Sequence, residues 1–282
     1  KRQVIKIEAP SDKSQMGGPR AGPDFQNLHR NKRSLTLNLK SAEGKKIFME
    51  LAQKADVVVE NFRPDVKHRL GIDYDSLAKH NPGLVYASIS GFGQDGPLAD
   101  RPGFDQIAQG MGGLMSITGE PGQGPMRVGI PIADLCAGLF AAQAVFIALL
   151  ERVKSGEGQW VQTSLLQAQA FMLDFQAARY LMDGEVPKQA GNNHPTSIPT
   201  GVFRTSDGYI NMAVAGELIW QRLAETLEKT EWCDDERFSV NEARSKNRDI
   251  LNSEIEKITT TQTSAYWVST LNQAGVPAGD IN

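Results

Sequence analysis

Strand-like and helix-like segments alternate through the first two thirds of the chain, and this order constrains the fold more than any other feature. The alternation of Leu35, Leu37 and Leu39 predicts a strand with one apolar face. Ser41 then predicts the N-cap of a helix whose apolar residues recur at helical spacing. The continuous run Val57–Val59 is typical of a strand covered on both faces. Strand, helix and strand in this order predict a mainly parallel sheet with covering helices.

Further strands are predicted over 84–90 and 160–165, with a long apolar helix over 132–154 between them. In parallel sheets covered by helices, ligands bind at the carboxyl ends of the strands. This places Asn61 and Phe62, which follow a strand directly, on the expected functional edge together with the glycine- and proline-rich loop 91–103.

The pattern changes after Asp183. We expect a large α/β domain over 1–183, a linker and active-site loop over 184–198, and a small α+β domain over 199–282. The small domain is predicted to hold a hairpin that turns at 206–208, followed by amphipathic helices over 217–228 and 242–258.

Composition excludes several classes of function. The 282 residues are 40% hydrophobic and 22% charged with a net charge of −3, so broad nucleic-acid binding is not expected. The apolar segment 131–150 is interrupted by Asp134, which predicts a core helix and no membrane association. Cys136 and Cys233 form no metal-binding motif, and no histidines pair at ligand spacing, so we expect no metal and a reducing compartment.

The segment Gly91–Gly96 matches the G-x-G-x-x-G pattern and follows a strand. A dinucleotide fingerprint must also open a helix, and Pro97 and Pro102 argue against one here. We therefore expect glycines that allow a close backbone approach, and no dinucleotide site.

Asp134 is the most informative single residue, and two interpretations compete for it. An acidic side chain in the first turn of a helix is favoured electrostatically by the helix dipole, which needs no function. Alternatively, a partly desolvated carboxylate at the edge of a pocket can act as a nucleophile. Residue type alone leaves both open.

Several segments, in this order and spacing, resemble the class III CoA-transferases, the family of formyl-CoA transferase and carnitine CoA-transferase. The segments are Val4–Glu8, Asn31–Lys40, Ala55–Pro64, Ser88–Pro97, Arg101–Gln109 and Gly129–Asp134. The resemblance covers essentially the whole chain and implies an α/β fold, with a Rossmann-like large domain and a smaller α+β domain. Compared with the family, an opening strand and a C-terminal segment are missing.

The resemblance also implies roles for particular positions. Asp134 matches the aspartate that forms covalent intermediates. Positions expected to bind coenzyme A are Leu37, Asn38, Leu39, Lys40, Asn61, Phe62, Arg63, Arg69, Pro102, Gly103, Phe104 and Asp105. An active-site loop is expected at Gly191, Asn192, Asn193 and His194. Ala9 stands where some members have an arginine, so one phosphate contact is either missing or supplied by Lys13 or Arg20.

Racemases of the same family are similar to this chain but pair the aspartate with a histidine. The equivalent position is Phe104, which cannot transfer a proton, so CoA transfer is favoured over racemisation. An acyl-CoA racemase or epimerase and a non-catalytic CoA-binding protein are the alternatives.

The resemblance further implies acyl-CoA and carboxylic acid substrates with no tightly bound cofactor. It also implies an interlocked homodimer for the full-length protein. We expect a cytoplasmic location, with an organellar matrix as the alternative.

Overall fold

The structure, a computed structural model, describes residues 3–10 and 22–282. The chain divides into two compact units. Unit 1 comprises Lys1–Leu114 and Val128–Ala178, and unit 2 comprises Met115–Arg127 and Arg179–Asn282. The loop that precedes the long apolar helix therefore belongs largely to unit 2.

Unit 1 is a mixed α/β structure with two parallel sheets, as the alternating pattern predicted. The strands β1 (Ile5–Glu8) and β2 (Arg33–Thr36) pair in one sheet. The other sheet has the order β3 (Val57–Glu60), β4 (Val85–Ser90) and β5 (Trp160–Ser164). The helices of unit 1 are α1 (Pro23–His29), α2 (Ala42–Ala52), α3 (Pro64–Leu70), α4 (Tyr74–Ala78), α5 (Asp105–Met111), α7 (Ile132–Ser155) and α8 (Leu165–Phe171). Two further helices, α6 (Leu114–Ile117) and α9 (Phe175–Asp183), contain residues of both units.

The predicted cap of α2 is confirmed, because the Ser41 hydroxyl accepts a hydrogen bond from the Gly44 N–H at 3.1 Å. The carbonyl oxygen of Asn38 lies so close to Gly44 that a Cβ there would meet it at 2.1 Å. Glycine is therefore required at this position, and the chain after β2 packs directly on the first turn of α2.

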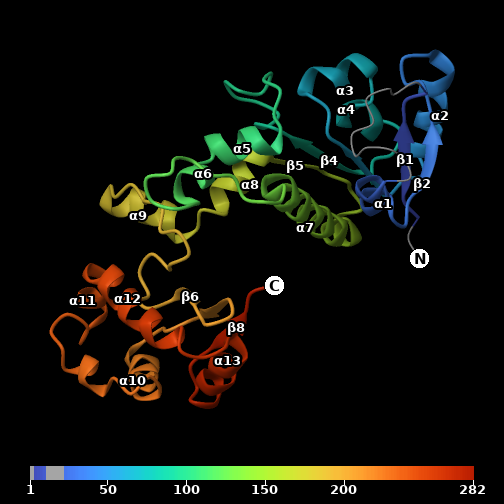
Figure 1. The fold of residues 1–282 in the computed structure, drawn as a ribbon. Coiled ribbons are helices and arrows are strands. Elements are labelled where there is room, and N and C mark those ends of the chain that lie inside the picture. Colours follow the sequence, from blue (N-terminus) through green and yellow to red (C-terminus); the bar gives the residue numbers. More distant parts are fainter. Residues whose placement is uncertain (1–2, 11–21) are drawn as a thin grey trace. The chain divides into compact units, whose positions relative to one another are not determined.

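Helix α7 packs against β4, β5 and α8, and Figure 1 shows it lying along these two strands. By length and composition α7 is apolar enough to cross a membrane, and a helix that covers a sheet meets the same criterion. It ends at Gly156, whose φ of 76° is the left-handed conformation that glycine adopts most easily.

The expectation that the strand Val57–Val59 is covered on both faces is wrong, because Val59 is 61% exposed. Its side chain lines an open apolar groove of about 240 Å³ together with Ala87, Ile89 and residues of α7 such as Val145 and Phe146. The β-branched run predicted the strand correctly, but α7 does not close over its last valine.

Unit 2 is built on the antiparallel sheet β6 (Gly201–Arg204), β7 (Tyr209–Met212) and β8 (Ala278–Asp280). The predicted hairpin turn is present, since the Thr205 N–H donates to the Gly208 carbonyl at 2.9 Å. The helical segments are α10 (Glu217–Thr226), η1 (Thr230–Cys233), α11 (Asn241–Lys246), α12 (Arg248–Thr259) and α13 (Ser264–Gln273). One apolar core joins these helices to the sheet, with Phe203, Trp220 and Leu251 fully enclosed.

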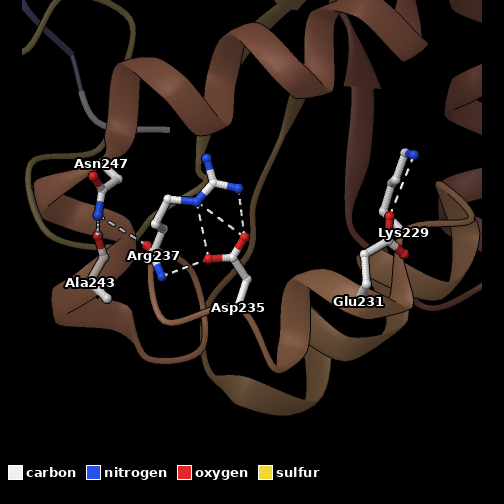
Figure 2. Close-up of polar contacts among 6 residues, drawn as sticks. All are labelled: Lys229, Glu231, Asp235, Arg237, Ala243 and Asn247. Carbon is white, nitrogen blue, oxygen red and sulfur yellow. Dashed lines mark hydrogen bonds and ion pairs between the residues drawn. The ribbon is translucent and has the colours of Figure 1, made fainter.

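The helix expected over 242–258 is two helices that break at Asn247. The Asn247 amide donates to the carbonyl oxygens of Ala243 at 3.0 Å and Arg237 at 3.2 Å, as Figure 2 shows. Asparagine commonly competes with the helix by bonding nearby backbone groups in this way. Arg237 in turn forms an exposed ion pair with Asp235 in the same view.

Candidate functional site

Asp134 lies in the first turn of α7, and the residue as a whole is exposed. The residue at the N-cap of this helix is Pro131, and no side-chain hydrogen bond is made by it. A helix N-terminus leaves several backbone N–H groups without intrahelical partners, so α7 needs acceptors from elsewhere.

Asp105 supplies such an acceptor from the first turn of α5. Its Oδ1 atom accepts hydrogen bonds from the N–H groups of Ala133 at 2.9 Å and Asp134 at 3.4 Å. Asp105 is 8% exposed, so this carboxylate is held inside unit 1. The structure thus brings two of the predicted site residues, Asp105 and Asp134, together.

Gln109, one turn further along α5, is fully buried and joins Asp105 to the chain that leads into α7. Its Nε2 atom donates to Asp105 Oδ2 at 2.7 Å and to the Ile130 carbonyl at 3.2 Å. Its Oε1 atom accepts from the Val128 N–H at 2.9 Å. Both ends of the amide are therefore used to fix residues 128–130 and the Asp105 carboxylate.

The electrostatic setting changes the acidity of Asp134. Partial burial of its carboxylate raises the pKa of Asp134 above its ordinary value, and the negative charge of Asp105 raises it further. The residue as a whole is exposed, so water still reaches the group and the size of the effect is limited. The result is a carboxylate that is more basic than usual yet accessible to a ligand.

One glycine of the G-x-G-x-x-G match, Gly91, packs closely against the backbone of a later segment. A Cβ on Gly103 would meet the Cα atom of Gly91 at 2.5 Å, so the two backbones cross at the carboxyl end of β4. This contact brings Pro102, Phe104 and Asp105 to that edge of the sheet. Phe104 is the N-cap residue of α5, and it is 62% exposed.

A buried polar cluster lies at the ends of β3 and β4. Glu60 forms an ion pair with Lys67 of α3 at 3.4 Å, and both side chains are nearly inaccessible to solvent. The Ser88 hydroxyl donates to Glu60 at 2.5 Å and accepts from the Trp160 indole N–H at 2.9 Å. The other Glu60 oxygen accepts the N–H of Phe62 at 2.7 Å, so this cluster sets the course of the chain through Asn61 and Phe62.

Most of the remaining positions expected to bind coenzyme A are exposed. Asn61, Arg63 and Arg69 are exposed, and the two arginines lie on either side of Asp65 at 3.9 and 3.2 Å. After β2, Leu37 is buried and Leu39 half-buried, whereas Asn38 and Lys40 are exposed. Lys13 and Arg20 lie outside the described residues.

The predicted active-site loop belongs to unit 2, whereas Asp134 belongs to unit 1. Hydrogen bonds hold this loop in place within unit 2. Gly191 donates to the Gly119 carbonyl at 3.0 Å, and Asn193 accepts from Asn252 of α12 at 2.7 Å. The ring of His194 accepts at Nδ1 from the backbone N–H of Ser197 at 2.9 Å. Asn192 is exposed beside them.

Sequence reasoning missed Glu60 and Lys67 as members of the candidate site and assigned no role to Gln109. One signal was available for Glu60, which follows directly on a β-branched run. A glutamate at the end of a buried strand needs a positively charged partner if it is buried too. The spacing of four residues between Asp105 and Gln109 on one helix also predicts that their side chains meet. Among the described residues, no group of three or more histidine, cysteine or acidic side chains is placed to hold a metal ion.

Comparison with known proteins identifies the family. The model of CoA-transferase family III matches residues 3–282. The chain is 38% identical over 285 residues to acetyl-CoA:oxalate CoA-transferase from Acetobacter aceti, covering 99% of this chain and 73% of the relative. It is 40% identical over 295 residues to succinate–glutarate CoA-transferase from Agrobacterium fabrum, with the same coverage of 99% and 73%.

A solved structure leads to the same family. The crystal structure of a CaiB/BaiF family protein from Brucella suis superposes with a TM-score of 0.86 at 38% identity, covering 99% of this chain and 76% of that chain. These matches confirm the family indicated by the sequence motifs. The chain belongs to CoA-transferase family III and is a class III CoA-transferase.

Proposed function

We propose that the protein moves coenzyme A from an acyl-CoA to a free carboxylic acid through covalent intermediates on Asp134. The observation that carries this proposal is an accessible carboxylate at the head of α7 whose pKa is raised by partial burial and by Asp105. A more basic carboxylate is a better nucleophile while it remains ionised at neutral pH.

The proposed reaction begins when a carboxylate oxygen of Asp134 attacks the thioester carbonyl of the donor. The C–S bond breaks, giving an aspartyl–acyl anhydride and the CoA thiolate. The thiolate then attacks the aspartyl carbonyl and releases the donor acid, leaving an aspartyl-CoA thioester. The acceptor carboxylate attacks this thioester to form a second anhydride, and the thiolate attacks its acyl carbonyl. The products are a new acyl-CoA and free Asp134, with no net change in protons or electrons.

Each tetrahedral intermediate carries an oxyanion that needs hydrogen-bond donors. We assign this role to backbone N–H groups of the glycine-bearing loops. Coenzyme A itself needs positive charge for its phosphates and an apolar surface for its pantetheine arm. Lys40, Arg63 and Arg69 are exposed cations among the predicted binding positions, and Phe62 and Phe104 provide apolar surface.

Substrate class is inferred from the relatives. Two relatives are named for dicarboxylic acids: one for oxalate, the other for succinate and glutarate. We propose that this protein also accepts small dicarboxylates, with acetyl-CoA and succinyl-CoA as first donors to test.

The finer architecture is also proposed. Unit 1 corresponds to a Rossmann-like CoA-binding domain, and the antiparallel sheet of unit 2 supports a small α+β domain. A homodimer is supported by apolar side chains that α7 leaves exposed, among them Leu139, Phe146 and Leu150. The two free cysteines are compatible with a reducing compartment such as the cytoplasm.

Racemisation has less support than CoA transfer, because Phe104 stands where a second acid–base group would be needed. Incubation of an α-branched acyl-CoA in deuterated water distinguishes the two. We expect no incorporation of deuterium at the α-carbon, and incorporation at a rate comparable to CoA exchange would favour the racemase.

The first test measures CoA exchange between acetyl-CoA or succinyl-CoA and a panel of dicarboxylates in the parent protein, Asp134→Ala and Asp134→Asn. We expect both variants to lose at least about a thousandfold in kcat, since loss of a catalytic nucleophile costs this much or more. Circular dichroism should show both variants folded. Exchange by Asp134→Ala at the parent rate would overturn the proposal.

A further inference from the structure

We propose that Asp105 is a positioning residue for Asp134, because its buried carboxylate caps α7 from a neighbouring helix and fixes the backbone that carries the nucleophile. This inference rests on the proposed function of Asp134. It assigns Asp105 a role in catalysis through Asp134 and not through coenzyme A.

The first argument is that α7 lacks a cap of its own. Four other helices are capped by the side chain of their own N-cap residue: Ser41 for α2, Asp73 for α4, Ser164 for α8 and Thr263 for α13. Helix α7 begins after Pro131, whose side chain has no hydrogen-bonding atom. A carboxylate is also the side chain best suited to the positive end of a helix dipole.

The second argument is the position of the two hydrogen bonds that Asp105 accepts. Their donors are the backbone N–H groups of Ala133, which is fully buried, and of Asp134 itself. A shift in Asp105 therefore displaces the backbone of Asp134 directly. Because reacting atoms must meet in a narrow range of geometry, a displacement of about 1 Å can cost about 100-fold in rate.

The third argument is that Asp105 is itself held in place. Gln109 donates to its second oxygen at 2.7 Å and uses the rest of its amide on Val128 and Ile130. Two side chains of α5 thus fix both the loop before α7 and its first turn. A buried network in which each group has its partner is rigid, which is what a positioned nucleophile requires.

The charge of Asp105 gives the proposal a measurable signature. The elements packed against α7 carry few ionisable groups: α5 has Asp105, β4 has Tyr86, and β5 and α8 have none. On α7 itself, Cys136 is buried and the charged residues Glu151, Arg152 and Lys154 lie in its last turns. Removing the negative charge of Asp105 should therefore lower the pKa of Asp134 and move the acid limb of the kcat/KM profile to lower pH.

Asp73 provides a matched control, because it is also an N-capping aspartate in unit 1 and is 8% exposed, as Asp105 is. Its carboxylate accepts from the Ser76 N–H at 3.1 Å and caps α4, a helix that carries none of the predicted site residues. The experiment compares Asp105→Ala, Asp105→Asn and Asp73→Asn with the parent by kcat, KM, the pH profile of CoA exchange and urea unfolding.

We expect Asp105→Ala to lose about ten- to hundredfold in kcat with KM for the acyl-CoA changed less than about twofold. Asp105→Asn keeps one side-chain oxygen for the two N–H groups, so its loss in kcat should be smaller, and its acid limb should move to lower pH. Asp73→Asn should lower stability but leave the acid limb where the parent has it.

Parental kcat in a folded Asp105→Ala protein would overturn the proposal, and so would an acid limb in Asp105→Asn that coincides with the parent. The Asp134 variants separate this outcome from failure of the proposed function. An inactive Asp134→Ala protein beside an unaffected Asp105→Ala protein would remove only the positioning role.

Discussion

Two acidic residues of unit 1, Glu60 and Asp134, occupy opposite electrostatic settings. Glu60 is buried beside Lys67, and its two oxygens accept hydrogen bonds from Ser88 and the Phe62 N–H. Asp134 is exposed, and the charge that shifts its pKa is that of another carboxylate, Asp105. The contrast separates a carboxylate that holds structure from one that is available for chemistry.

The difference follows from what each site does with its charge. A buried ion pair whose oxygens already accept hydrogen bonds is poorly available to a ligand and resists change. A carboxylate that is partly desolvated and close to a like charge is held in a less favourable ionised state, which favours reaction with an electrophile. Removing the charge should therefore destabilise the folded protein at Glu60 and stabilise it at Asp134.

The largest effect on stability is expected from Lys67→Met, which leaves the buried Glu60 carboxylate without its cation. Breaking a buried pair by removing one partner costs about 3–5 kcal/mol. The double variant Glu60→Gln, Lys67→Met removes both charges and should recover part of this loss. Urea unfolding measures both, and a single variant within about 1 kcal/mol of the parent would show that Glu60 does not depend on Lys67.

A smaller loss is expected from Ser88→Ala in the same cluster. The substitution removes a hydroxyl that donates to Glu60 and accepts from Trp160, so the buried Glu60 carboxylate and the Trp160 indole each lose a partner. The expected decrease in the free energy of unfolding is about 1–3 kcal/mol. Ser76→Ala, at a half-buried hydroxyl in unit 1, is a suitable control and should cost less. Equal losses would contradict the special role of the cluster.

The smallest effect, and the only one of opposite sign, is expected from Asp134→Asn. Burial and Asp105 raise the pKa of Asp134 in the folded protein, so stability falls as pH rises from the ordinary value through the raised one and stays lower above it. The variant should therefore be more stable than the parent at pH 7, by less than about 1 kcal/mol because the group is exposed. The gap should close as pH falls below the ordinary value, and a variant less stable at pH 7 would contradict this setting.

Much of the fold was predictable from local patterns. The parallel strands, the Ser41 cap and the apolar helix from Ile132 follow from alternation, capping chemistry and periodicity. The break at Asn247 and the exposure of Val59 did not follow, because both depend on which distant surfaces meet. A side chain bonding two carbonyls, or a helix that stops short of a strand, leaves no periodic signal.

The site divides in the same way. Asp134, Asn61 and Phe62 were found from strand ends and family motifs, and the structure places them near sheet edges or a helix start. The capping of α7 by Asp105 was not predicted, because its donors lie 28 and 29 residues away in sequence. The same holds for the Glu60–Ser88 bond, which joins residues 28 positions apart.

The central claim, that Asp134 carries the acyl and CoA groups, is tested most directly by trapping. The protein is incubated with succinyl-CoA without acceptor, quenched with hydroxylamine, digested and examined by mass spectrometry. We expect a hydroxamate on the peptide containing Asp134, in amounts that depend on succinyl-CoA and with none in Asp134→Asn. Exchange at the parental rate without modification of that peptide, or a hydroxamate on another acidic residue, would contradict the account.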